Sequence, residues 1–239
     1  MSNKAKARAY FTAVNNYDES TIEQMVDENY IQHNPFVPTG RAAFVSLLPK
    51  LKAHGSKIEN KRMLQDGPYI AMHHVWKNAA PFGKNEMAAF HIIRFDKAGL
   101  IAEHWNVMTE LVSQASVDGE TEINDVERTE KNKSIVSEFF GLWTDGTTKA
   151  QYDALSRFFH PGCREHGSRA TVDYKRQHKL IGEGNFVLAI GEGILGEKPT
   201  ACYDLFRLEN GKIADHWNIY QEIPGTGLAN DNTMFGFLL

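Results

Sequence analysis

Apolar and polar residues alternate on both sides of a glycine turn in two separate stretches, which predicts two β-hairpins. One hairpin spans residues 90–107 around Gly99, and the other spans residues 203–219 around Gly211. The first ends in the letters EHWNV at 103–107, and the second ends in DHWNI at 215–219. Because so many ordered positions match, we predict that the chain is a tandem duplication.

The two copies also align upstream of these hairpins. Residues 66–70 match 183–187, again as a turn that enters a strand, and residues 30–33 match 163–166. Helical segments are predicted before them at 4–15 and 20–28 in the first copy, and at 127–144 and 151–159 in the second. Residues 113–124 are polar and acidic, which is typical of a linker. The predicted domains are therefore 1–115 and 125–239.

One predicted helix is present in the first copy alone. The interval from His33 to Asp66 is 16 residues longer than the interval from His166 to Glu183. The additional residues correspond to 39–54, where Phe44 and Leu51 belong to an apolar pattern with helical spacing. We predict a helix there that the second copy lacks.

Composition excludes several classes of protein. The formal net charge is −4, and lysine and arginine are scattered, so no basic stripe for nucleic acid is visible. No apolar run approaches the ~20 residues of a membrane helix, and the first residues lack the apolar core of a signal peptide. Cys163 and Cys202 form no CxxC pair, which argues against a cysteine zinc site or a disulfide framework. These features predict a cytoplasmic protein that binds neither nucleic acid nor membrane.

Three motifs carry a resemblance to a known family. The letters YIQHNP at 30–35, the strand pair from Asp204 to Trp217, and the ending NTMF at 232–235 resemble SnoaL-like polyketide cyclases of the nuclear transport factor 2-like superfamily. The resemblance implies an α+β cone, a curved antiparallel sheet wrapped by helices. Together with the repeat, the expected fold is two tandem cones, the second of which lacks one helix. The resemblance also implies a pocket without metal or organic cofactor, and an aldol cyclisation or isomerisation of an apolar carbonyl compound.

Such a reaction needs a base, a donor for the enolate oxygen and walls that exclude water. The resemblance implies a carboxylate after the HW pair, but Asn106 and Asn218 stand there, and an amide cannot exchange a proton near neutral pH. Histidine titrates near neutrality and could replace it. The candidate catalytic residues are His33, His74, His91 and His104, with Asn106 as a hydrogen-bonding group; His74 is included because the family usually has a histidine on its strand. Each histidine could instead be a hydrogen-bonded structural residue.

Other residues have simpler interpretations. Three histidines could ligate zinc, but no HxH or HExxH spacing occurs and the resemblance implies a metal-free pocket. Arg94 is expected to pair with Glu103, and Arg207 with Asp215, across neighbouring strands. The tryptophans of the two HW pairs are expected to be core or sheet anchors.

The second copy is expected to be a degenerate scaffold without a good pocket, because Gly191 aligns with His74 and the covering helix is absent. The leading functional hypothesis is a cofactor-independent acid–base enzyme with its pocket in the first copy. The alternative is a module that binds a small apolar molecule without chemistry. The copies are expected to form a pseudo-dimer within a monomer, or a dimer through another surface.

Overall fold

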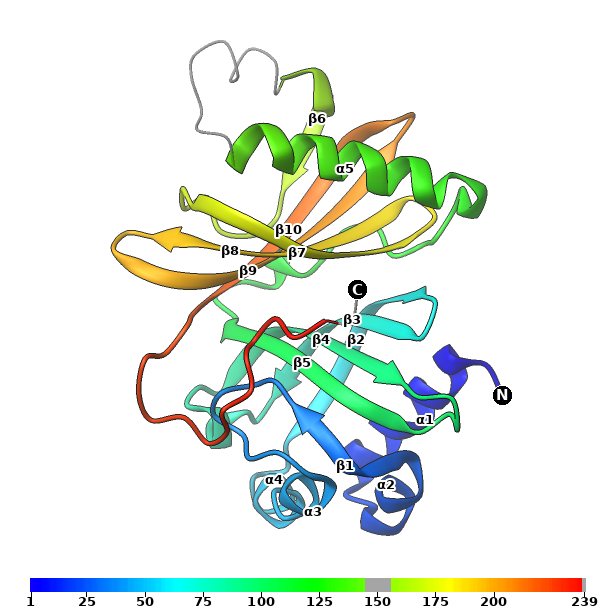
Figure 1. Cartoon of the computed structure of the whole chain (residues 1–239), viewed down its shortest axis with the longest axis vertical. Helices are drawn as coiled ribbons and strands as arrows, with labels where there is room; N and C mark the ends of the chain where they lie inside the picture. Colours follow the sequence, from blue (N-terminus) through cyan, green and yellow to red (C-terminus); the bar gives the residue numbers. More distant parts are fainter. Residues whose placement is uncertain (145–155, 238–239) are drawn as a thin grey trace. The chain divides into compact units, whose positions relative to one another are not determined.

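Each half of the chain forms a five-stranded mixed sheet in the computed structural model, which describes residues 1–144 and 156–237 (Figure 1). The first sheet has the order β1-β5-β4-β3-β2, and the second has the matching order β6-β10-β9-β8-β7. The strands of the first sheet are β1 (Val26–Gln32), β2 (Lys57–Asp66), β3 (Tyr69–Lys77), β4 (Glu86–Phe95) and β5 (Ile101–Glu110). The strands of the second are β6 (Phe159–Glu165), β7 (Asp173–Glu183), β8 (Phe186–Leu195), β9 (Lys198–Glu209) and β10 (Lys212–Glu222).

The pairing within the two sheets confirms the predicted duplication. In each sheet the first strand pairs in parallel with the last, β1 with β5 and β6 with β10, and the other neighbours are antiparallel. Arg94 lies opposite Glu103 in one sheet, and Arg207 lies opposite Asp215 in the other. The α+β fold predicted from the sequence is therefore present twice, as two cone-type units.

Helices cover one face of each sheet, because each presents an apolar side to it (Figure 1). The first sheet is covered by α1 (Asn3–Asn16), α2 (Glu19–Met25), α3 (Arg41–Val45) and α4 (Leu48–His54). On α1, Phe11 packs in one core with Met72 and Trp76 of β3. The second sheet is covered by α5 (Thr129–Thr144), whose Phe139 packs in a core with Phe206. Within the described residues the second unit has fewer helices, as predicted.

Three predicted helices differ from the observed elements. The segment 39–54 contains two short helices, α3 and α4, instead of one. The segment 20–28 is helical only to Met25, because Val26 begins β1 and pairs with Ile101. The segment 151–159 lies partly outside the described residues; Ser156–Phe158 form a 3-10 turn and Phe159 begins β6.

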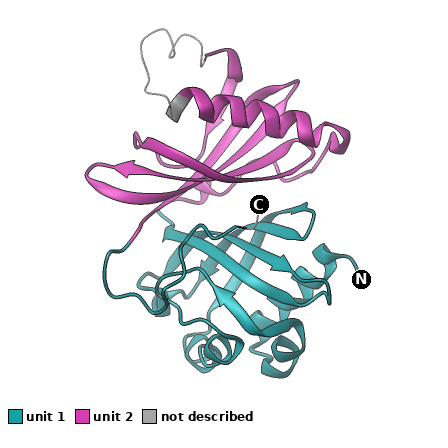
Figure 2. Cartoon of the chain, in the orientation of Figure 1, with its two compact units in different colours: residues 1–112, 224–239 teal, residues 113–223 magenta. Residues whose placement is uncertain are grey.

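The unit boundaries differ from the predicted ones in the segment that follows each repeat, residues 113–124 and 224–239. The compact units are residues 1–112 with 224–239, and residues 113–223 (Figure 2). The C-terminal segment 224–239, predicted to belong to the second domain, therefore belongs to the first unit. The segment 113–124, predicted to be a linker, packs within the second unit, where Asp118 accepts a hydrogen bond from the indole of Trp217 at 2.8 Å. Each of these two segments is held by hydrogen bonds to its unit, and these bonds could not be predicted from its composition.

Candidate functional site

In the first unit, three of the predicted site residues meet at one cavity. His91, His104 and Asn106 line it together with Gln32 and Asn34, while the walls are apolar side chains such as Phe44 and Leu51. Register explains this arrangement, because His91 lies opposite Asn106 on the paired strands β4 and β5. The cavity is small, at about 40 Å³.

A chain of hydrogen bonds fixes the protons of these histidines. The Trp76 indole can only donate, and it donates to Nε2 of His91 at 3.1 Å. His91 must then carry its proton on Nδ1 and donate it to Nε2 of His104, 2.8 Å away. The remaining ring nitrogen of His104, Nδ1, then carries the proton and lies 3.1 Å from Nε2 of Gln32, which is also a donor, so this contact is not a hydrogen bond in that tautomer. In this arrangement neither imidazole keeps a lone pair that is free to take a proton from a ligand.

Burial keeps this cluster uncharged. It lowers the pKa of both His91 and His104 well below the usual value, and the charge of a neighbouring histidine lowers each further. The side-chain oxygen of Asn106 accepts a hydrogen bond from the amide nitrogen of Asn34 at 3.0 Å, so these two atoms are already engaged. The floor of the first cavity is therefore neutral and largely hydrogen-bonded.

The other two predicted histidines do not line the cavity. His74 is fully buried, its ring packs edge-on against Phe11 at 4.6 Å, and neither ring nitrogen has a hydrogen-bond partner in the described residues. Burial lowers its pKa to about 3. His33 lies on the other face of the sheet, stacked on Trp105 at 4.5 Å, with Nδ1 2.7 Å from the Thr233 carbonyl oxygen.

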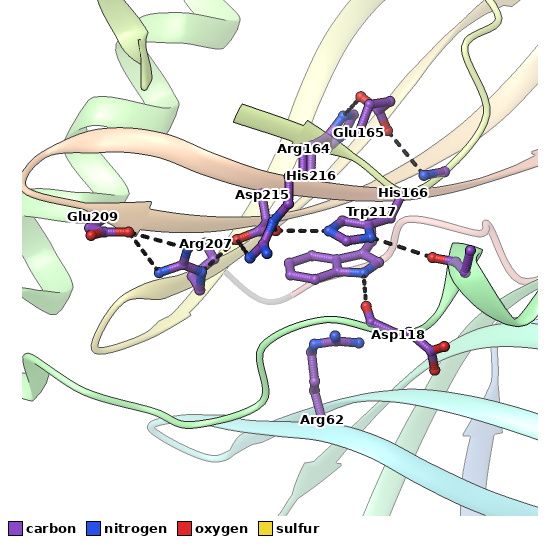
Figure 3. A network of polar contacts seen from close by, with 12 residues as sticks. Arg62, Asp118, Arg164, Glu165, His166, Arg207, Glu209, Asp215, His216 and Trp217 are labelled. Atoms are coloured by element: carbon purple, nitrogen blue, oxygen red, sulfur yellow. Dashed lines mark hydrogen bonds and ion pairs between the residues drawn. The ribbon is translucent and has the colours of Figure 1, made fainter. Parts of the chain in front are cut away.

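The predicted ion pairs are present on that other face of each sheet. Arg94 and Glu103 are 2.8 Å apart, and Arg207 and Asp215 are 2.6 Å apart. In the second unit, Asp215 also binds Arg164 at 2.7 Å and His166 at 2.8 Å (Figure 3). Successive residues of a strand point to opposite faces, and His216 lines the pocket of the second unit. The network around Asp215 therefore lies on the face opposite to that pocket.

The larger pocket lies in the second unit, contrary to the expectation of a degenerate scaffold. Its volume is about 360 Å³, within the range of known ligand sites. Its apolar walls include Phe139, Phe159 and Phe206. Its polar lining includes Asp204 and His216, together with the hydroxyls of Tyr174 and Tyr220.

The polar groups of this pocket form a charged triad. His216 contacts Glu165 through Nδ1 at 2.6 Å and Asp204 through Nε2 at 2.9 Å. The side chain of Asp204 is 1% exposed and that of Glu165 is 31% exposed, so the triad runs from the buried floor towards solvent. Oδ1 of Asp204 also accepts hydrogen bonds from Tyr174 at 3.0 Å and Tyr220 at 3.2 Å.

The two carboxylates determine the charge of His216. Burial alone would lower its pKa, but the hydrogen bonds and charges of Asp204 and Glu165 together outweigh burial and raise the pKa to about 9. Burial, followed by the charge of Asp204, raises the pKa of Tyr174 and of Tyr220. At neutral pH both tyrosines are therefore hydroxyl donors beside an imidazolium.

Equivalent positions of the two sheets account for the difference between the pockets. In the second unit, Asp204 replaces His91 and Glu165 replaces Gln32. Gly193 occupies the position of Trp76, so the second unit has no indole there. The donor to Asp204 is instead the hydroxyl of Tyr174, the residue that pairs with Gly193.

The sequence carries one signal that could have located the second pocket. Asp204 and His216 lie on consecutive hairpin strands, and both residues occur within the repeated motif. Tyr174 carries no such signal, because it lies on β7 outside any motif and reaches the floor only through the sheet register.

The described part of the chain offers neither a metal cluster nor a membrane-spanning helix. Among residues 1–144 and 156–237, no group of three or more histidine, cysteine, aspartate or glutamate side chains is arranged to hold a metal ion. No helix in the same residues is both long and apolar enough to cross a bilayer.

Comparisons with known proteins extend this picture. A search of curated proteins finds no match. Among solved structures, a putative polyketide cyclase from Streptomyces antibioticus is 17% identical, covers 45% of this chain and 92% of its own, and gives a TM-score of 0.40. A SnoaL-like polyketide cyclase from Agrobacterium tumefaciens is 16% identical, with coverages of 46% and 94% and a TM-score of 0.39. A protein of unknown function with a cystatin-like fold from Methylobium petroleophilum is 15% identical, with coverages of 47% and 78% and a TM-score of 0.39.

The family model of the SnoaL-like domain matches residues 7–104. This range runs from α1 to His104 and so contains most of the first sheet and its cavity. Residues 7–104, which form most of the first unit, are therefore similar to a SnoaL-like domain.

Proposed function

We propose that the protein is a cofactor-independent acid–base enzyme that acts on a small, largely apolar carbonyl compound in the pocket of its second unit. The observation that carries the proposal is the pair of Asp204 and His216 on the floor of a pocket with aromatic walls. A buried carboxylate beside hydroxyl donors is a group set suited to removing a proton next to a carbonyl.

Each group has a distinct role in the proposed reaction. Asp204 takes the proton from the carbon next to the ligand carbonyl, so that a C–H bond breaks and a carboxyl O–H bond forms. The electron pair moves to the carbonyl oxygen, and the hydroxyl of Tyr220, which donates to Asp204 before the reaction, turns to donate its hydrogen bond to the enolate. His216 orients Asp204 through the contact at 2.9 Å. Phe139 and Phe206 exclude water from the reacting carbon.

The test uses β-tetralone, a bicyclic aromatic ketone with exchangeable hydrogens next to its carbonyl. Exchange of these hydrogens for deuterium is followed by NMR in heavy water. Asp204→Asn is expected to reduce the protein-dependent rate to background, and Tyr220→Phe to reduce it by about 10²-fold, the loss typical of one donor to an oxyanion. His104→Ala in the first cavity is the control and is expected to leave the rate unchanged.

The alternative is a module that binds the same class of ligand without chemistry. It is favoured by the amide at Asn218, since this group cannot act as a base. Tight binding of β-tetralone to the wild-type protein, with no deuterium exchange above background, would decide for this alternative.

Acid–base chemistry by His91 or His104 in the first cavity, with Asn106 bound to the substrate, stays a prediction with less support. The hydrogen-bond chain leaves neither imidazole a free lone pair. His33 and His74 have no access to that cavity, so alanine at His74 is expected to change stability and not turnover. Location in the cytoplasm and the monomeric state also stay predictions.

A further inference from the structure

One side of the second-unit pocket is formed by a polar loop between β6 and β7. Ser168, Arg169 and Thr171 of this loop line the pocket and are exposed to solvent. The guanidinium of Arg169 makes no hydrogen bond or ion pair with any residue that the structure describes. A cation therefore lies at the pocket mouth, while Asp204 lies at its buried floor.

Asn218 holds this loop in place. Its amide donates to the Ser168 carbonyl oxygen at 2.9 Å and accepts from the Ser168 backbone N–H at 2.7 Å. A carboxylate could only accept, so an asparagine makes this pair of bonds and an aspartate does not. Gly167 is required beside it, because a Cβ there would lie 2.4 Å from the side-chain oxygen of Asn218. The asparagine in the repeated motif thus fixes the loop that carries Arg169.

The corresponding loop of the first unit has a different character. Residues 35–38 read Pro-Phe-Val-Pro, whereas residues 168–171 read Ser-Arg-Ala-Thr. Phe36, which is 58% exposed, stands where the second unit has Arg169. This loop is therefore apolar in the first unit and carries a cation in the second.

We infer that Arg169 forms an anion subsite, and that the ligand of the second unit is an apolar carbonyl compound with a carboxylate at the end remote from the reacting carbonyl. This inference rests on the proposed function of the same pocket. The triad that runs from the floor towards solvent holds two carboxylates, Asp204 and Glu165, and one imidazolium, so its net charge repels a second anion. The ligand carboxylate is drawn to the mouth, and this orientation presents the carbonyl to Asp204.

The experiment compares two matched probes, 4-oxo-4-phenylbutanoate and its methyl ester. Both are aryl ketones of nearly the same shape, and only the first carries a charge. Dissociation constants are measured by calorimetry with the full chain at low ionic strength. We expect the acid to bind about tenfold more tightly than the ester, since a charge-assisted hydrogen bond contributes that much. Raising the salt concentration is expected to reduce this preference.

Arg169→Ala is expected to remove the preference for the acid while leaving the affinity for the ester unchanged. Arg169→Lys is expected to keep part of it, because the charge remains but the planar fork is lost. Arg176→Ala is the matched control, since Arg176 is an exposed arginine of the same unit that does not line the pocket.

The outcomes separate the two proposals. Equal binding of both probes to the wild-type protein would overturn the anion subsite and leave the pocket intact. A preference that persists in Arg169→Ala would also overturn the subsite. Failure of both probes to bind the wild-type protein would remove the proposed function and the subsite together.

Discussion

One side chain, on β4 of the first unit and at the equivalent place on β9 of the second, decides the charge of each cavity. In the first unit this residue is His91, which accepts from an indole and donates to a second imidazole. In the second unit it is Asp204, which accepts from an imidazolium and from two tyrosines. Because every partner of a carboxylate must be a donor, the change to Asp204 is accompanied by tyrosines at positions 174 and 220.

His74 is expected to destabilise the first unit. Its two ring nitrogens are buried without a partner in the described residues, and such a group costs about 1 kcal/mol or more. Replacing it with leucine is therefore expected to raise the free energy of unfolding by about 1 kcal/mol. Amide hydrogen exchange, measured by mass spectrometry, reports the stability of each unit separately. Slower exchange is expected in β3 of the variant.

The substitution His91→Leu is the matched control for His74→Leu. It removes the same kind of side chain from the neighbouring strand but leaves the indole N–H of Trp76 and Nε2 of His104 without the partners that His91 supplies. A loss of about 2 kcal/mol is expected. If both variants changed stability in the same direction, the missing partners of His74 would not explain its effect.

His216 is expected to make the second unit less stable in alkali. Its folded pKa of about 9 lies above the unfolded value of about 6.5. Its contribution to stability is therefore complete below pH of about 6.5 and is lost as the pH rises to about 9. NMR titration of the ring checks the pKa.

Glu165→Gln tests the cause of this shift. It places in the second unit the amide that Gln32 supplies in the first, so the pKa of His216 is expected to fall. Glu209→Gln, which removes an exposed carboxylate near Arg207, should leave the titration of His216 in place. An unchanged pKa in Glu165→Gln would mean that Asp204 alone holds the charge.

Among the elements, β7 and β8 approach closely at one glycine. A Cβ on Gly193 would lie 2.7 Å from the Asp173 carbonyl oxygen and 2.7 Å from Val172. Gly193→Ala is therefore expected to push β7 away, cost about 2 kcal/mol and weaken the contact of Tyr174 with Asp204. Thermal unfolding measures the cost, and the hydroxyl contact is followed by the pKa of His216.

A second glycine gives the control for this strand pair. Gly141 lies in α5, and a Cβ there meets nothing within 4 Å. Gly141→Ala is expected to stabilise the protein by about 0.5 kcal/mol, because alanine loses less backbone freedom in a helix. Similar effects of both substitutions would show that close approach of the strands is not the reason for Gly193.

Local sequence predicted the hairpins better than it predicted the helix ends. Alternation and the glycine turns located β4, β5, β9 and β10, because these signals act over a few residues. The helix predicted at 39–54 is broken because the ring of Pro49 clashes with the carbonyl of Val45, where α3 ends. The end of α2 at Met25 could not be predicted from local pattern, since it depends on the pairing of Val26 with a strand far along the chain.

The same limit applies to the candidate sites. His91, His104 and Asn106 were predicted from the family resemblance and the chemistry of histidine, and they meet at the cavity because they lie on the paired strands β4 and β5. His74 lies on β3 but is buried under Phe11 and does not reach the cavity, and burial depth depends on how the helices pack. The second pocket was missed because its floor needs Tyr174, whose position follows from the register with Gly193.

For the whole chain, the segment that follows each repeat packs within the unit of the other repeat. The segment after β5 packs within the unit of the second repeat, and the segment after β10 packs within the unit of the first. In the first unit, Asn230 donates to the carbonyl oxygens of Asn34 and Val37 at 2.8 and 2.7 Å. Phe237 stacks on Trp105 at 4.5 Å. The YIQHNP motif and the NTMF ending also bind each other, since Asn232 donates to the Gln32 carbonyl oxygen at 3.0 Å and Nδ1 of His33 lies 2.7 Å from the Thr233 carbonyl oxygen.

Removing residues 224–239 is expected to destabilise the first unit, although this segment follows the second repeat in the sequence. The deletion leaves the carbonyl groups of Asn34 and Val37 without the donor that Asn230 supplies, and each lost bond costs about 1 kcal/mol. Hydrogen exchange is expected to quicken in β1 and β5 and to stay unchanged in β9 and β10. Asn230→Ala should give a weaker form of the same pattern. Asn185→Ala is the reciprocal control: its side chain accepts from the N–H of Asn124 at 2.9 Å, so its effect should appear in the second unit. Faster exchange in β9 and β10 after deletion of the tail would instead place the segment with the second unit, as the order of the sequence alone predicts.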